Sequence, residues 1–172
     1  MAVRRDVCLR LRTRWSECRD CADACPVDAL RIGEHALSLG GGCTGCGRCQ
    51  AACPTGALDV RGFDFAAASP GEGVTIECVL PRPTTRAGRT LRVPCLGGLS
   101  AGRLLALCAA AGDGEVVLAD HGQCATCPSG GDVHPAFDAV HRVRELLREA
   151  AVDEARAPRI RRSSPGSTSA QN

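Results

Sequence analysis

Residues 43–54 read C-T-G-C-G-R-C-Q-A-A-C-P, and this stretch decides how the first part of the chain folds. Its cysteines follow the spacing C-x2-C-x2-C-x3-C-P. Three thiolates separated by two residues each can surround one Fe4S4 cube if the loop is tight, and Gly45 and Gly47 permit tight turns because they lack a Cβ. Cys53 lies too far along the chain to close the same cube. The motif therefore predicts a second half-site elsewhere in the chain.

The second half-site lies upstream, where a shift of 28 residues superimposes two copies of one unit. Six residues of the first copy then match the second: Cys18, Cys21, Cys25, Pro26, Ala29 and Leu30 fall on Cys46, Cys49, Cys53, Pro54, Ala57 and Leu58. Such a repeat predicts two similar supersecondary units packed about a pseudo-twofold axis. One position fails, because Trp15 stands where the second copy has Cys43. Cys8, ten residues before Cys18, is the nearest replacement.

Residues 3–62 resemble the two-cluster bacterial ferredoxins. The resemblance implies that Cys25, Cys43, Cys46 and Cys49 hold one 4Fe-4S cluster. It also implies that Cys18, Cys21 and Cys53 hold a second 4Fe-4S cluster, and we predict Cys8 as its fourth ligand. Three alternatives stay open at this position: a 3Fe-4S cluster, a fourth ligand from outside the chain, or a Cys8 that is only a small buried side chain.

Composition and charge exclude several classes of protein. The 13 cysteines have the spacing of metal ligands, and the arginine-rich N-terminus has no apolar signal-peptide core, so a secreted disulfide scaffold is excluded. We expect a cytoplasmic protein with no membrane span, because no run of about 20 apolar residues occurs. All basic residues are arginine and the formal net charge is only +2, which predicts no nucleic-acid partner.

The resemblance implies a two-cluster ferredoxin-type domain, and the pattern of apolar residues after it predicts a small α/β domain and then a disordered tail, so we expect an α+β protein. In the first domain we expect a strand over 6–12, a helical turn over 26–30, and a hairpin that pairs Leu30 and Ile32 with Leu37 and Leu39. In the second we expect strands at 74–80, 91–94 and 115–119, a helix from Ser100 to Gly112, and a helix over 135–151. The predicted boundaries are 1–62 for the first domain, 63–73 for a linker, 74–153 for the second domain and 154–172 for a disordered basic tail.

Four cysteines of the second domain follow the ends of predicted strands: Cys78, Cys95, Cys124 and Cys127. Because sites in parallel sheets gather at the carboxyl ends of the strands, we expect these thiols at one edge. They suit a 2Fe-2S cluster or zinc, with unliganded thiols as a third reading. His121 and His134 flank the Cys124–Cys127 pair, which keeps zinc open. Cys108 lies in an apolar helix and is predicted to be a core residue.

Two stretches of the second domain resemble the small iron–sulfur (delta) subunit of methyl-viologen-reducing hydrogenases. They are V-P-C-L-G-G-L-S at 93–100 and V-V-L-A-D-H-G-Q-C-A-T-C-P at 116–128. The resemblance implies a 2Fe-2S cluster in an α/β domain that passes electrons between a hydrogenase and a partner such as heterodisulfide reductase.

No acid/base pair, nucleophile constellation or phosphate loop accompanies these cysteines, so a stand-alone enzyme is the weaker reading. We predict an electron-transfer protein that relays single electrons within a hetero-complex of hydrogenase, reductase or dehydrogenase subunits. The alternative is an assembly or regulatory module in which iron–sulfur clusters are structural or sensing.

Overall fold

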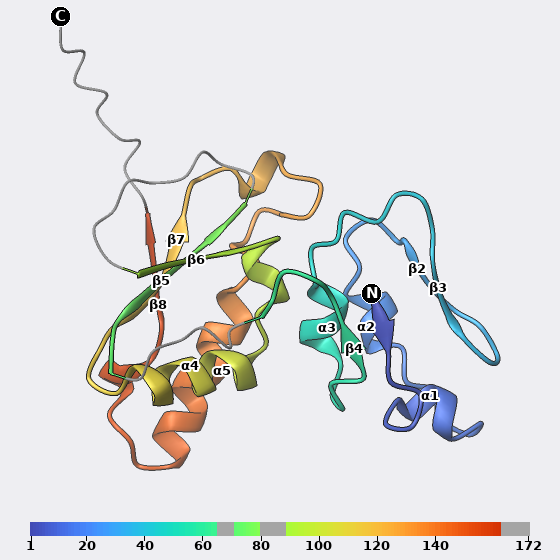
Figure 1. Ribbon diagram of the computed structural model, residues 1–172, viewed down its shortest axis with the longest axis horizontal. Coiled ribbons are helices and arrows are strands. Elements are labelled where there is room, and N and C mark those ends of the chain that lie inside the picture. Colours follow the sequence, from blue (N-terminus) through green and yellow to red (C-terminus); the bar gives the residue numbers. More distant parts are fainter. Residues whose placement is uncertain (65–70, 80–88, 163–172) are drawn as a thin grey trace, which may run out of the picture.

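The computed structural model describes residues 1–64, 71–79 and 89–162 of the 172-residue chain. Helices and strands are mixed along the chain. Short elements make up the N-terminal part, and a parallel sheet with two helices makes up the C-terminal part (Figure 1). The two parts lie side by side, with α3 on the side of the N-terminal part that faces the sheet (Figure 1).

In the N-terminal part, two small antiparallel sheets flank a pair of short helices. The strand β1 (Ala2–Val3) pairs with β4 (Leu58–Asp59), and β2 (Leu30–Ile32) pairs with β3 (Leu37–Leu39). The predicted hairpin is confirmed, because Leu30 faces Leu39 and Ile32 faces Leu37 in its register.

The predicted internal repeat appears as two short helices that start 28 residues apart. These are α2 (Asp20–Asp23) and α3 (Arg48–Ala52), and they contact each other. Each helix begins inside its cysteine loop and ends before the proline that follows. Pro26 and Pro54 disfavour a helical conformation at the preceding cysteine, so the helix of each repeat copy ends there. The helical turn predicted over 26–30 is therefore wrong, since the helix comes before Pro26 and residues 26–28 form a turn.

The strand predicted over 6–12 is also wrong, because α1 (Leu9–Arg12) occupies this stretch with Cys8 at its N-terminus. The Cys8 amide donates to the carbonyl of Arg4 at 3.1 Å, and the Arg12 amide donates to the carbonyl of Cys8 at 2.9 Å. Alternation over only a few residues cannot distinguish a strand from a short helix. No partner strand lies beside this segment among the described residues, so local hydrogen bonds decide its conformation.

The C-terminal part is built on a four-stranded parallel sheet of order β6-β5-β7-β8. Its strands are β5 (Val74–Cys78), β6 (Arg89–Val93), β7 (Val116–Asp120) and β8 (Arg159–Arg162). The three predicted strands are thus present, with Ile76 of β5 between Leu91 of β6 and Leu118 of β7. Ile76 and Leu118 are fully buried, as expected of central strands.

The two predicted helices are confirmed as α4 (Ala101–Ala111) and α5 (Phe137–Glu149). Ser100 caps α4, because its Oγ accepts a hydrogen bond from the Arg103 amide at 3.2 Å. The helices pack against each other on one face of the sheet (Figure 1). Leu104 of α4 and Val143 of α5 are fully buried in the core that results.

The chain does not become a disordered tail at residue 154. A short 3₁₀ helix (Glu154–Arg156) leads into β8, which pairs in parallel with β7 through Leu118 and Ile160. The composition of this stretch is misleading because its arginines lie at the surface and form ion pairs. Arg159 and Arg161 both pair with Glu115, at 3.3 and 2.6 Å, while Ile160 packs on the core. Residues 163–172 of the predicted tail lie outside the described residues.

Candidate metal centres

Two thiol-lined cavities lie in the N-terminal part, one beside each cysteine loop. The first is lined by Cys8, Cys18, Cys21 and Cys53. The second is lined by Cys25, Cys43, Cys46 and Cys49. Each cavity therefore receives one cysteine from the other repeat copy: Cys53 joins the first and Cys25 joins the second. This exchange is the arrangement that the repeat and the resemblance imply.

The pKa values of the thiols show how closely each set is gathered. Burial first, and then the neighbouring thiols of Cys53 and Cys18, together raise the pKa of Cys21 to about 11. Burial also raises the pKa of Cys49, and Cys46, Cys25 and Cys43 add to the shift. Negative thiolates so close together repel one another, and a bound cation would remove this repulsion. The two sets are therefore suited to cationic metal centres.

The two exchanged cysteines accept equivalent backbone hydrogen bonds. The Ala29 amide donates to Cys25 Sγ at 3.2 Å, and the Ala57 amide donates to Cys53 Sγ at 3.2 Å. Burial acts to raise the pKa of both thiols, but the hydrogen bonds that they accept outweigh it and lower both values. Amides donated to sulfur stabilise thiolate ligands, so the loops after Pro26 and Pro54 hold both sulfurs in the form that binds metal.

Cys8 lies in the first cavity, whereas Trp15 lies outside it. Cys8 is 9% exposed at the start of α1, and Trp15 is 79% exposed. The helix α1 thus brings a fourth thiol to the place where the repeat lacks one. The proximity accords with the prediction that Cys8 is a ligand, and the ligand role itself stays a prediction.

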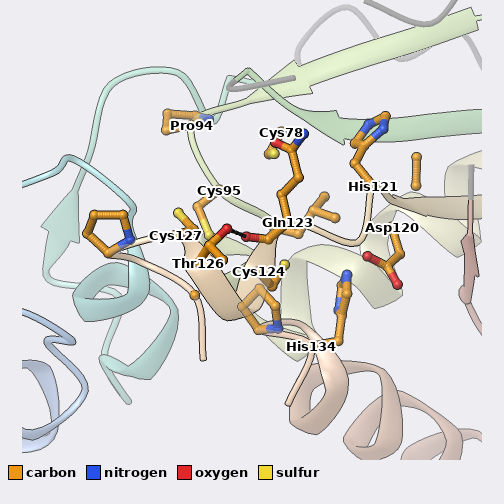
Figure 2. Close-up of a pocket in the computed structure, with 15 residues that line it drawn as sticks. Cys78, Pro94, Cys95, Asp120, His121, Gln123, Cys124, Thr126, Cys127 and His134 are labelled. Atoms are coloured by element: carbon orange, nitrogen blue, oxygen red, sulfur yellow. Dashed lines mark hydrogen bonds between the residues drawn. The ribbon is translucent and has the colours of Figure 1, made fainter. Parts of the chain in front are cut away.

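A third cavity lies at the carboxyl edge of the parallel sheet (Figure 2). Cys78 ends β5, Cys95 follows β6, and Cys124 and Cys127 follow β7 in a short 3₁₀ turn. All four line this cavity, as strand-end geometry predicts. Burial raises the pKa of Cys95 to about 11, and it also raises the pKa of Cys124. The Gly97 amide donates to Cys95 Sγ at 3.4 Å, an N–H···S contact like those of Cys25 and Cys53.

Asp120 and His134 also line the third cavity, next to Cys124 (Figure 2). One ligand atom of each of these three residues lies within 4.8 Å of the others. Burial lowers the pKa of His134, and its Nε2 is buried without a hydrogen-bond partner among the described residues. Its Nδ1 accepts a hydrogen bond from the Ala136 amide at 3.3 Å. The sequence analysis did not single out Asp120, although its place at the end of β7 is the signal that could have found it.

His121 lines the same cavity, but its imidazole lies beside an acidic side chain of β5. Its Nε2 lies 3.6 Å from the carboxylate of Glu77, which is 1% exposed and also pairs with Arg92 Nε at 3.1 Å. Cys108, predicted as a core residue, lies in the hydrophobic core on α4 with 9% exposure.

The loops that line the second and third cavities contact each other across the boundary between the two parts. Arg48 Nη2 donates to the carbonyl of Gly130 at 2.8 Å, and Gln50 Nε2 donates to the carbonyl of Gly98 at 3.4 Å. Ser129 Oγ donates to Thr44 Oγ1 at 2.7 Å. These bonds join the loop of the second cavity to both loops that carry thiols of the third.

Charged groups of one part also change the pKa values of thiols in the other part. The raised pKa of Cys95 is due first to burial, but Cys46 from the second cavity adds to it. The Arg48 guanidinium acts in the opposite direction on Cys95 and on Cys124. Phe63, predicted as part of a linker, is 3% exposed and packs into the same boundary.

Comparison with known proteins gives one match. The model of a family described as "4Fe-4S dicluster domain" matches residues 16–57, which include Cys18, Cys21, Cys25, Cys43, Cys46, Cys49 and Cys53. No curated protein and no solved structure matches. The chain therefore contains a ferredoxin-type iron–sulfur domain, and this supports an electron-transfer role. The resemblance to the hydrogenase delta subunit stays a prediction. Among the described residues, no helix is long and apolar enough to cross a membrane.

Proposed function

We propose that the protein relays single electrons through two 4Fe-4S clusters, held by Cys8, Cys18, Cys21 and Cys53 and by Cys25, Cys43, Cys46 and Cys49. The observation that carries this proposal is the exchange of Cys25 and Cys53 between the two cavities. An exchange of this kind ties the two sites into one folded unit, as the spacing of two-cluster ferredoxins requires.

The residues present fit these clusters in their chemistry. Eight thiols form two sets of four, and Ala29 and Ala57 donate backbone hydrogen bonds to sulfur in equivalent places. When bound, a 4Fe-4S cluster accepts and releases one electron at a time, at a potential that hydrogen bonds to sulfur and solvent exposure adjust. The amides of Ala29 and Ala57 favour extra negative charge on the sulfurs, and so they favour the reduced state.

The proposal includes a further metal centre in the third cavity. This centre is either a 2Fe-2S cluster or zinc, held by Cys78, Cys95, Cys124 and Cys127. Four thiols at one sheet edge supply a full ligand set for either. A second donor set, made of Asp120, Cys124 and His134, shares Cys124 and is typical of zinc. We favour the four thiols, because three strand ends bring all four to one cavity and the Gly97 amide donates a hydrogen bond to Cys95 Sγ.

The order of the centres follows from the contacts between the two parts. The loop of Cys46 touches Gly98, three residues after Cys95, and Arg48 binds Gly130 next to the Cys124–Cys127 turn. If the third centre is a 2Fe-2S cluster, we expect it to exchange electrons with the cluster of the second cavity. The cluster of the first cavity then lies at the other end of the route.

Redox partner proteins are part of this proposal, because a relay needs a donor and an acceptor. We propose hydrogenase, reductase or dehydrogenase subunits in the cytoplasm as the class of partner. An incomplete ligand set at the position of Trp15 would favour the alternative, an assembly or regulatory module. The thiol of Cys8 in the first cavity weakens that alternative.

The test is an electron count on the cluster-loaded, full-length protein under anaerobic conditions. After reduction by dithionite and removal of the excess, we expect about two electrons per chain to pass to a one-electron acceptor, or about three with a 2Fe-2S centre. Iron that dithionite cannot reduce reversibly would support the assembly or regulatory reading instead.

A further inference from the structure

The two repeat copies differ in what covers them. Gly47, Arg48 and Gln50 of the second copy contact the C-terminal part. The equivalent residues of the first copy are Arg19, Asp20 and Ala22. Arg19 and Asp20 are exposed, so no described part of the chain covers this face of the first copy.

The contact of the second copy depends on residues that the first copy lacks. Gly47 has a φ of +78°, and a Cβ there would stand 2.5 Å from the ring of Phe63. Arg48 and Gln50 provide the hydrogen bonds to Gly130 and Gly98. The second copy is therefore adapted to an internal partner. The equivalent face of the first copy lies beside a cavity of the same kind, and no described residue of the C-terminal part covers it.

The segment just before α2 carries the most exposed large apolar side chain of the described residues. Trp15 is 79% exposed, and the Arg14 guanidinium lies over its ring at 4.7 Å from the centroid. Exposed tryptophan beside arginine is typical of the residues that dominate binding energy at protein interfaces. Trp15 is three residues before Cys18 of the first cavity, so a partner bound to it would lie close to that centre.

Charge indicates the chemistry of the partner. Residues 1–23 contain six arginines and four acidic residues, an excess of two positive charges. Since the whole chain has a formal charge of +2, the remaining residues are balanced in charge. Arg19 pairs with Asp23 at 3.5 Å, so Arg12 and Arg14 are the arginines next to Trp15 that attract an acidic partner. The helix α1, which carries Arg10 and Arg12, lies at the end of the molecule away from the parallel sheet (Figure 1). The positive end is therefore the end that bears the first cavity.

We propose that an acidic one-electron carrier protein docks on the face formed by Arg12, Arg14 and Trp15, which we call the Trp15 face, and exchanges electrons with the cluster of Cys8, Cys18, Cys21 and Cys53. This inference rests on the proposed function. In the exchange the carrier loses one electron and the cluster gains it, or the reverse. No bond forms or breaks, and no proton needs to move.

The test uses the full-length, cluster-loaded protein and an acidic flavodoxin in its hydroquinone form as the carrier. Stopped-flow absorbance gives the second-order rate constant of electron transfer, and calorimetry with both proteins oxidised gives the Kd. The variants are Arg14→Glu, Arg12→Glu and Trp15→Ala. The matched controls lie on α5 in the C-terminal part: Arg144→Glu for the charge and Phe137→Ala for the exposed aromatic ring, which is 51% exposed.

We expect each arginine variant to lower the rate constant roughly tenfold at low ionic strength, with a difference that shrinks at high salt. Trp15→Ala should raise the Kd roughly fivefold or more at both salt concentrations, because apolar contact is not screened. The control variants should stay within about twofold of the wild type.

Reduction by dithionite separates this inference from the proposed function. A small reductant does not need the Trp15 face, so all variants should be reduced by it as the wild type is. Protein that dithionite cannot reduce would contradict the proposed function. Wild-type protein that dithionite reduces but flavodoxin does not, or Trp15-face variants that match their controls in rate and Kd, would overturn the docking proposal. Binding of this face to anionic vesicles or RNA, with electron transfer unchanged in the variants, would overturn it as well.

Discussion

The carbonyl oxygen of Cys46 lies directly against Gly98, so that a Cβ added at Gly98 would stand 2.7 Å from it. Cys46 lines the second cavity, and Gly98 belongs to the turn that follows Cys95 in the third. The backbone of the Cys46 loop thus contacts the backbone of the Cys95 turn between the two candidate metal centres. This contact is the basis of the proposed route between two parts of different architecture.

Gly98→Ala should destabilise the protein. The added methyl group would meet Cys46 and the ring of Phe63, both in a buried boundary, and overpacking of this kind costs about 1–3 kcal/mol. Gly102→Ala in α4 is the matched control, because nothing lies within 4 Å of its Cβ position and alanine favours helix by up to about 1 kcal/mol. Anaerobic urea denaturation followed by circular dichroism gives both free energies. Equal stabilities for the two variants would contradict the tight contact.

Cys8→Ala should change the cluster of the first cavity without unfolding the chain. With three thiols left, we expect one iron to be lost and a 3Fe-4S signal to appear in the EPR spectrum of the oxidised protein. Cys108→Ala is the matched control, since both thiols are 9% exposed but Cys108 lies in the helix core. If Cys8→Ala keeps the iron content and EPR spectrum of the wild type, Cys8 is not a ligand.

Cys95→Ser and His134→Ala should separate the two donor sets of the third cavity. With the four-thiol set, Cys95→Ser loses the third metal and His134→Ala keeps it, as measured by iron and zinc analysis of the purified proteins. The opposite result would assign the metal to Asp120, Cys124 and His134. Both variants should keep the iron of the two 4Fe-4S clusters, which serves as the internal control.

The stability of the metal-free protein should fall as the pH rises above about 9. Burial raises the pKa of Cys21 and Cys95 to about 11 in the fold, above the ordinary value of 9.0. Between these values the unfolded chain loses protons that the folded chain keeps, so ionisation favours unfolding. Urea denaturation of the metal-free protein at pH 8 and pH 10 measures this effect. Cys21→Ala should reduce the pH dependence, whereas an unchanged dependence would mean that Cys21 does not contribute.

The sequence was sufficient for the N-terminal sites because metal ligands obey strict local spacing. The repeat pairs Cys25 with Cys53, and the resemblance to two-cluster ferredoxins implies that each of them joins the thiols of the other copy. The strand ends at Cys78 and Cys95 were equally predictable, because a parallel sheet brings all its carboxyl ends to one edge. Cys8 was predicted as the fourth ligand only because it is the cysteine nearest to the copy that lacks one at Trp15. The segment around it was predicted as a strand and is a helix.

The features that sequence analysis missed depend on contacts between distant residues. The strand β8 exists because Ile160 reaches the core and Glu115 pairs with Arg159 and Arg161, which composition alone does not reveal. The boundary between the two parts depends on Arg48, which contacts a residue 82 positions away. One local signal was present, because Arg48 is a position where the two repeat copies differ.

Anaerobic iron and sulfide analysis with EPR during a redox titration tests the central claim most directly. We predict about eight irons and eight sulfides per chain in two reversibly reducible 4Fe-4S clusters, with about two further irons or one zinc in the third cavity. A 2Fe-2S centre there should also show magnetic interaction with the cluster of Cys46 when both are reduced. A protein without reversibly reducible clusters would contradict the relay.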